Sequence, residues 1–159
     1  MKPKLYLETT IVGYLTGRLS RDVVTAGQQM TTKQWWNTRR HDFNLYCSEL
    51  VVGEAQAGDK AYAEERLVHL AGLPVLDISQ MALALARALL KRKALPAIAE
   101  NDALHLAIAA VNGMKYLLTW NCRHLANASL RPTMERVCKK AGYRCPIICT
   151  PFELLEEGP

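Results

Sequence analysis

The chain has 159 residues and a mass of 17.8 kDa, which is typical of one domain with a single core. Half of the residues are hydrophobic and 22% are charged, so collagen-like, low-complexity and disordered classes are excluded. The net charge of +5 is compatible with a polyanionic partner but is weak support for one.

Short extended segments alternate with helical segments along the chain. We predict strands at 4–7, 43–47, 75–78, 115–119 and 146–150. The first predicted helix begins near 8–10, and the second ends near 37–40. Five further helices are predicted over 48–58, 59–71, 79–93, 101–112 and 129–141. This alternation predicts one α/β domain over residues 1–159, with a mostly parallel sheet covered on both faces. Sites in such folds lie at the carboxyl ends of the strands.

The location in the cell and the state of the thiols follow from simpler features. The longest apolar stretch, 81–86, is far shorter than the about 20 residues of a membrane helix, and the stretch 5–7 is too short for a signal peptide. We therefore expect a cytoplasmic protein without a membrane span. The five cysteines match neither a zinc ribbon nor a thioredoxin pair, so we expect reduced thiols packed as small hydrophobic groups: Cys47, Cys122, Cys138, Cys145 and Cys149.

Four polar residues are placed to meet at one edge of this sheet. Glu8 follows the first strand, and Asn121 follows the strand that ends at Thr119. Glu54 lies on the inward stripe of its helix, where a partly exposed edge or a structural ion pair is the alternative explanation. Asp102 begins a buried helix, where a helix cap is the alternative to a ligand.

Three carboxylates and an amide supply only oxygen ligands, which suit Mg²⁺ or Mn²⁺ and not zinc. Such an ion could polarise a phosphoryl oxygen and activate water for phosphodiester hydrolysis. Without it, like-charge repulsion should raise the pKa of at least one acid, so Asp102→Ala should not weaken the metal-free fold. The sequence contains no P-loop, dinucleotide-binding or zincin motif.

Five segments, four of them around these residues, form a recognisable pattern. In chain order they are Leu5-Tyr6-Leu7-Glu8-Thr9-Thr10, Ser48-Glu49-Leu50-Val51-Val52-Gly53-Glu54, Asn101-Asp102-Ala103-Leu104-His105-Leu106-Ala107-Ile108-Ala109, Leu118-Thr119-Trp120-Asn121-Cys122-Arg123-His124-Leu125 and the closing Thr150-Pro151. Together they resemble the PIN-domain family, and most closely its VapC-type toxins. The resemblance implies a three-layer α/β/α sandwich, a Mg²⁺- or Mn²⁺-dependent ribonuclease, a homodimer, and a small antitoxin protein that covers the site.

Residue by residue, the resemblance assigns Glu8, Glu54 and Asp102 to metal binding and catalysis. Glu8 stands where the family usually has Asp, one methylene shorter, which puts full activity in question. Asn121 matches the last acidic position and is expected to be a neutral outer ligand or to position water. Thr9, Thr119 and Arg123 are assigned to substrate binding, with Arg123 contacting a phosphate.

Several alternatives remain open. For His105 and His124 a structural role is favoured over that of a general base, and at least one of Trp35 and Trp36 should pack in the core or a dimer contact. The run 91–93 is interpreted as the solvated end of a helix rather than an RNA groove. The rival to a ribonuclease is a PIN-like module that binds nucleic acid or an antitoxin without cutting. The sequence does not separate RNA from DNA as substrate.

Overall fold

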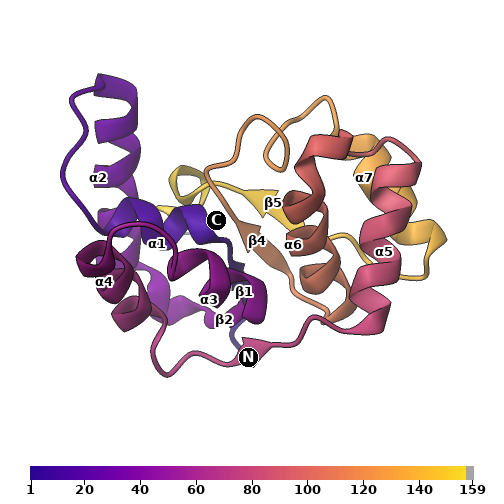
Figure 1. Ribbon diagram of the computed structural model, residues 1–159, viewed down its shortest axis with the longest axis horizontal. Coiled ribbons are helices and arrows are strands. Elements are labelled where there is room, and N and C mark those ends of the chain that lie inside the picture. Colours follow the sequence, from indigo (N-terminus) through magenta and orange to yellow (C-terminus); the bar gives the residue numbers. More distant parts are fainter. Residues whose placement is uncertain (157–159) are drawn as a thin grey trace.

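The computed structural model describes residues 1–156, in which five strands form one parallel sheet in the order β3-β2-β1-β4-β5 (Figure 1). The strands are β1 (Lys4–Leu7), β2 (Asn44–Ser48), β3 (Val75–Leu76), β4 (Tyr116–Leu118) and β5 (Ile147–Cys149). The α-helices are α1 (Thr9–Leu15), α2 (Val23–Thr38), α3 (Glu49–Ala55), α4 (Lys60–Leu70), α5 (Gln80–Lys91), α6 (Glu100–Val111) and α7 (Arg131–Lys140). Short 3₁₀ helices cover Arg40–Asp42, Ala97–Ala99 and Pro151–Leu154. The predicted α/β class with a parallel sheet is confirmed.

Helices begin where the sequence places a polar side chain that can accept a backbone N–H. At the N-termini of α1, α2, α3, α4 and α5 the capping side chains are Glu8, Asp22, Ser48, Asp59 and Ser79. Each satisfies a donor of the first turn that has no partner within the helix. Helices α6 and α7 differ, because Ala99 and Leu130 occupy their cap positions and no side chain caps either helix.

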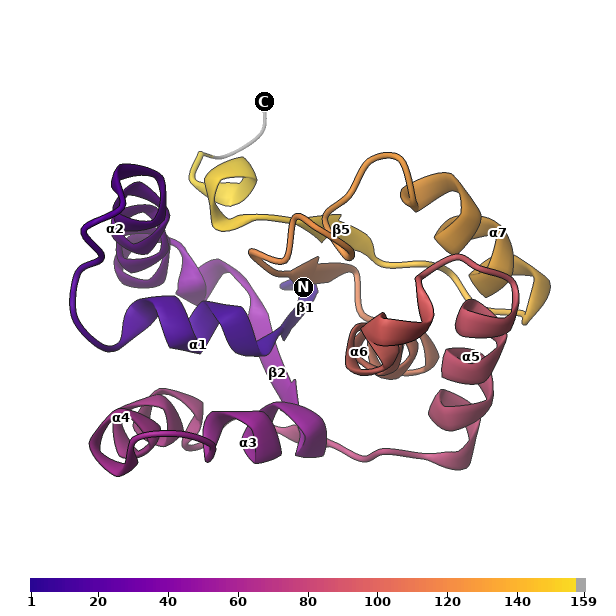
Figure 2. The ribbon, with the colours of Figure 1, turned by 45° about the horizontal axis from the view of Figure 1, so that its top comes forward.

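Alternate strand residues supply two cores, one on each face of the sheet, and this gives the three-layer α/β/α sandwich (Figure 2). On one face, Tyr6 and Leu117 pack with α3, α5, α6 and α7. On the other, Leu5 and Leu118 pack with α1 and α2, including the fully buried Trp35. Trp36 is only partly buried, so the expected core position is taken by Trp35.

Three strands are shorter than predicted: β4 and β5 lack one expected residue at each end, and β3 lacks its last two. Only Val75 and Leu76 of the expected segment 75–78 pair with the sheet, opposite Cys47 and Ser48. The chain turns into α3 directly after Ser48, so nothing remains for Asp77 and Ile78 to pair with. None of the helices in residues 1–156 is long and apolar enough to cross a membrane.

The five cysteines are free, and three of them are buried as expected. Cys122 is exposed and Cys145 partly so, and burial raises the pKa of the Cys149 thiol to about 12. Because Cys122 is the most accessible of the five thiols, a disulfide reagent at pH 8 should modify it first in the native protein and all five thiols after denaturation. Loss of the fast phase in Cys122→Ser, followed spectrophotometrically, checks this; an unchanged fast phase contradicts it.

Candidate active site

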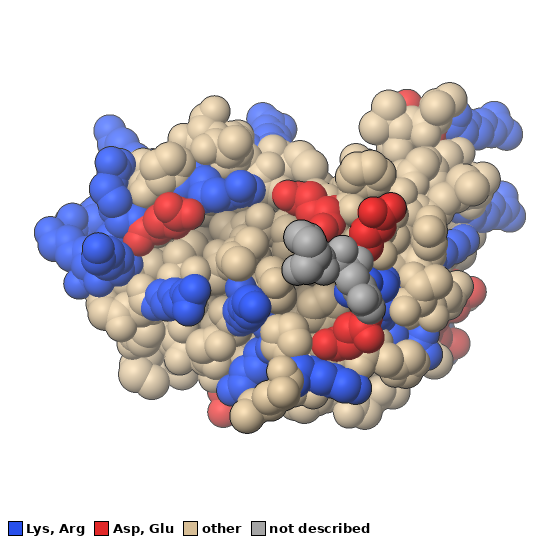
Figure 3. Space-filling model, turned by 180° about the vertical axis from the view of Figure 1, so that it is seen from behind, with Lys and Arg blue, Asp and Glu red and all other residues tan. Residues whose placement is uncertain are grey.

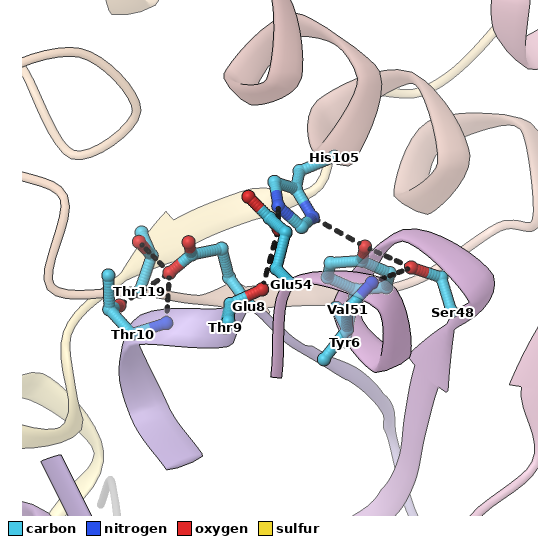
Figure 4. A network of polar contacts seen from close by, with 9 residues as sticks. All are labelled: Tyr6, Glu8, Thr9, Thr10, Ser48, Val51, Glu54, His105 and Thr119. Carbon is cyan, nitrogen blue, oxygen red and sulfur yellow. Dashed lines mark hydrogen bonds and ion pairs between the residues drawn. The ribbon is translucent and has the colours of Figure 1, made fainter. Parts of the chain in front are cut away.

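Glu8 lies at the carboxyl edge of the sheet, where β1 leads directly into α1. Its backbone N–H bonds to the carbonyl of Leu118, which continues the pairing of β1 with β4 beyond the strands. The side chain is only 4% exposed. Its Oε2 accepts hydrogen bonds from the backbone N–H and hydroxyl of Thr10 and from Thr119 Oγ1 at 2.9 Å (Figure 4). Three donors therefore fix the direction of this carboxylate.

Glu54 extends from α3 toward α6. Its Oε1 accepts a hydrogen bond of 2.7 Å from Thr9 Oγ1 and lies 2.5 Å from His105 Nε2 (Figure 4). Burial alone would raise the pKa of Glu54, but hydrogen bonds from His105, Thr9 and Asn101 lower it. The expected rise in pKa from repulsion among the acids is therefore wrong for Glu54. Both structural alternatives are present, because Glu54 is 31% exposed and forms a pair with His105.

Behind Glu54, a buried chain of hydrogen bonds fixes His105. Nδ1 of His105 lies 2.7 Å from Tyr6 Oη, which lies 2.8 Å from Ser48 Oγ (Figure 4). Ser48 Oγ accepts from the N–H of Val51. Every atom is satisfied if Ser48 donates to Tyr6, Tyr6 donates to Nδ1, and Nε2–H donates to Glu54. Tyr6, Ser48 and His105 are at most 1% exposed, so each donor and acceptor needs this protein partner.

Asp102 lies in the first turn of α6 and contacts the loop after β4. Its Oδ2 is 2.9 Å from His124 Nδ1, and the backbone N–H of His124 donates to Asn121 Oδ1 at 3.0 Å. The alternative that Asp102 caps the helix is wrong, because Ala99 holds that position. Asp102 and His105 are three residues apart on α6, so they share a face of that helix.

The four predicted residues belong to two separate lines of hydrogen bonds. One runs from Glu8 through Thr119 to the N–H of Asn121, then through His124 to Asp102. The other starts at Thr9, the neighbour of Glu8, and reaches Glu54 and His105. We call Glu8, Glu54, Asp102 and Asn121, with these connecting residues, the carboxylate network. The favoured structural role of His105 and His124 agrees with their contacts to the acids.

The three residues assigned to substrate have different surroundings. Thr9 is partly exposed and donates to Glu54. Thr119 is fully buried, and its hydroxyl is enclosed between Glu8 and the backbone N–H of Asn121. The buried position of Thr119 does not match the expected contact with substrate. Its hydroxyl is already bonded to two protein partners and orients Glu8 instead. Arg123 is exposed and adjoins the network through the chain.

The carboxylate oxygens of Glu8, Glu54 and Asp102 are the type of ligand that a hard divalent cation prefers. Each acid uses one oxygen in the contacts with threonine or histidine described above. Among residues 1–156, however, no three acidic, histidine or cysteine side chains are gathered closely enough to hold a metal ion.

Sequence reasoning missed the residues that brace the acids. Tyr6, Ser48 and Thr10 were assigned to a strand or to helix starts, yet Thr10 donates to Glu8, and Tyr6 links Ser48 to His105. A signal was present at Tyr6, because a tyrosine in an otherwise apolar central strand needs a buried partner for its hydroxyl.

Most of the chain matches a known protein family. Residues 21–127, about two thirds of the chain, match the family model described as the PIN domain. The chain belongs to the PIN domain family. Glu8 lies before the matched residues 21–127. It joins the network because it follows β1 in the sheet. No curated protein matches the sequence.

Solved structures share the fold of this PIN domain at low identity. VapBC2 from Rickettsia felis, bound to a DNA fragment from its promoter, is 17% identical over 92% of this chain and 97% of the other, with a TM-score of 0.60. A toxin–antitoxin complex from Klebsiella pneumoniae is 20% identical over 93% and 98%, with a TM-score of 0.60. VapC20 from Mycobacterium tuberculosis, a toxin that cleaves the sarcin–ricin loop, is 16% identical over 79% and 95%, also with a TM-score of 0.60. At these identities the likeness establishes the fold.

Proposed function

We propose that this PIN domain is a Mg²⁺- or Mn²⁺-dependent endoribonuclease. The observation that carries the proposal is the carboxylate network at the carboxyl edge of the sheet, in which threonine and histidine side chains contact Glu8, Glu54 and Asp102. An acidic site at this edge of a parallel α/β sheet, in a chain of this family, supports metal-assisted hydrolysis of phosphodiesters.

In this proposal each residue of the network has a distinct role. When bound, a divalent cation would neutralise the acids and polarise a phosphoryl oxygen. Glu8, Glu54 and Asp102 would hold it, each kept in direction by threonine or histidine donors. Asn121 would position water through its amide, Arg123 would contact a phosphate, and Thr119 would hold Glu8 in place. Hydrolysis by water predicts products with a 3′-hydroxyl and a 5′-phosphate.

The test is cleavage of a generic RNA in Mn²⁺ and in EDTA, with single-stranded DNA of the same sequence in parallel. Cleavage of RNA that depends on Mn²⁺ and stops in EDTA supports the proposal. An RNA that binds but stays intact at high protein concentration supports the non-catalytic alternative instead. Preferential cleavage of DNA contradicts the assignment of RNA as the substrate.

The family and its structural relatives support a role as the toxin of a toxin–antitoxin pair. The relatives from Rickettsia felis and Klebsiella pneumoniae are toxin–antitoxin complexes. We propose a cytoplasmic homodimer whose acidic edge is covered by a small antitoxin. Light scattering of the purified chain tests the dimer, and copurification with the product of an adjacent short reading frame tests the antitoxin.

Metal binding should be visible without catalysis. A ligand that binds the native state alone stabilises it by about 2.7 kcal/mol at a hundredfold excess over Kd. We therefore expect Mn²⁺ or Mg²⁺ to raise Tm in calorimetric scans, and Zn²⁺ to have no specific effect. Asp102→Asn is the matched control, since it keeps the side-chain shape and should lose the shift. An equal shift in both proteins would place the metal elsewhere.

The departure at Glu8 gives a second prediction. Glu8→Asp keeps the charge and should retain appreciable cleavage, although it shortens the reach toward Thr119. Glu8→Gln keeps the length and an oxygen acceptor for Thr10 but removes the charge, so it should lose cleavage. Initial rates on one RNA, with the Tm of each variant as the folding control, check this order. Equal rates for wild type and Glu8→Gln would show that Glu8 binds no metal.

A further inference from the structure

The net charge of the chain is confined to its second half. Residues 1–80 contain nine lysines and arginines and nine acids, whereas residues 81–159 contain eleven and six. The excess is concentrated in segments 87–93 and 131–144, which hold nine cations and a single acid, Glu135. These segments are the end of α5, the turn after it, α7 and the turn that follows α7.

The fold brings the two segments together on one surface. Helices α5 and α7 pack against each other, and Lys and Arg side chains gather over this end of the molecule, on the left in Figure 3. Eight of the nine cations are exposed; Arg131 is partly buried and donates to the carbonyl of Ile148. We call this surface the basic face; its exposed members are Arg87, Lys91, Arg92, Lys93, Arg136, Lys139, Lys140 and Arg144.

The basic face adjoins the helix that carries part of the carboxylate network. Only residues 94–99 separate Lys93 from α6, which begins at Glu100 and presents Asp102. Figure 2 shows α5 and α6 side by side, and their residues pack closely. A long strand held at the network can therefore continue over α5 toward α7.

Helix ends alone do not explain so much charge. A helix C-terminus carries about half a negative charge, which one cation such as Lys91 or Lys140 already offsets. The single negative charge of Glu135 can neutralise only one of the remaining cations of the face. A set of like charges held together in this way attracts a polyanion.

We propose that the basic face binds the phosphate backbone of RNA outside the cleavage site. This rests on the proposed function for the choice of RNA. Protein interfaces are built around an apolar centre, but none of the exposed large hydrophobic side chains lies in 87–93 or 131–144. Backbone phosphates need only lysine and arginine, so nucleic acid fits this surface better than an acidic protein does.

The test measures binding and cleavage separately. Binding of a labelled 20-nucleotide single-stranded RNA is followed by anisotropy in EDTA over a series of KCl concentrations. The variant K91Q/R92Q/K139Q/K140Q is compared with K2Q/R21Q/K33Q/K60Q, which removes four exposed cations of the same types from the first half of the chain. Both variants change the net charge equally, and Tm checks that both fold.

The face variant should reduce the slope of log Kd against log salt by about 0.7 for each phosphate that the protein no longer neutralises. If two or more phosphates are left without a cation, Kd at 0.1 M salt should rise by about tenfold or more, while the control variant stays near wild type. In Mn²⁺, KM for the long RNA should rise, whereas kcat on a substrate of a few nucleotides should not change.

The other outcomes have definite meanings. Equal losses of affinity in both variants would trace the effect to net charge and overturn the proposal, as would an unchanged slope in the face variant. A face variant that loses binding to duplex DNA or poly-glutamate but keeps binding to RNA would assign the face to that other partner and overturn the proposal. Slope and Kd changes as predicted, with no cleavage by any protein, would refute the nuclease and leave the RNA-binding face standing.

Discussion

Replacement of Asp102 by asparagine is expected to reduce RNA cleavage by about a thousandfold while the fold remains intact. The asparagine can keep its oxygen toward His124 Nδ1, now 2.9 Å from Asp102 Oδ2, so the loop after β4 should stay in place. What is removed is one negative charge among the three acids, and a single preorganised electrostatic contact contributes about 10² to 10³ in rate. Single-turnover cleavage in Mn²⁺ measures the reduction in rate.

The matched control is Asp77→Asn, an exposed aspartate in the loop before α5. It removes the same charge from the chain and should cleave at the wild-type rate. If Asp102→Asn retains more than about a tenth of the activity, Asp102 does not hold the metal, and its contact with His124 is structural alone. If the control loses activity equally, the effect comes from net charge.

The network also changes what is expected of Asp102→Ala without metal. Three acids at one edge suggested that removing Asp102 relieves repulsion. Asp102 and Glu54 instead each face a histidine, and Asp102 and His124 are both less than one fifth exposed. Asp102→Ala in EDTA should therefore be somewhat less stable than wild type, because the bond to His124 is removed.

The fold could be predicted because its signals are local and repeat along the chain. Polar caps such as Ser48 and Asp59 mark where helices begin, and the alternation of strands and helices requires a parallel sheet with both faces covered. The carboxyl edge of that sheet follows from the same reasoning, so the neighbourhood of Glu8 and Asn121 was predictable. The length of β3 could not be predicted, because β3 can extend only as far as β2 continues beside it.

The partners of the acids could not be predicted, because they come from distant segments. The contact of Glu54 with His105 joins residues 51 apart, and that of Tyr6 with His105 joins residues 99 apart. A sequence pattern shows that His105 lies on an apolar helix, but not which polar atoms meet it there. The resemblance to the family assigns roles to the acids but none to Tyr6, Ser48 and Thr10, whose contacts are seen only in the folded chain.

The second large effect is expected at His105. His105→Ala removes a side chain that is 1% exposed and leaves the Tyr6 hydroxyl without its acceptor. The reduced packing and the unsatisfied buried group should cost about 3 kcal/mol of unfolding free energy, or about 6–12 °C in Tm. Because Glu54 also loses its donor, the cleavage rate of folded His105→Ala should be about 10- to 100-fold below that of wild type, as is typical when a metal ligand loses its supporting bond.

Two variants separate the role of His105 in positioning Glu54 from its role in stability. Tyr6→Phe keeps the ring in the core but removes the hydroxyl between Ser48 and His105, so it should cost about 1–2 kcal/mol with a smaller loss of cleavage than His105→Ala. His105→Gln can still donate an N–H to Glu54 but cannot accept and release a proton as imidazole does. If His105 only positions Glu54, His105→Gln should recover most of the cleavage that His105→Ala loses, with Tm partly restored. Cleavage as low in His105→Gln as in His105→Ala, at a Tm near wild type, would show that the imidazole itself takes part in proton transfer.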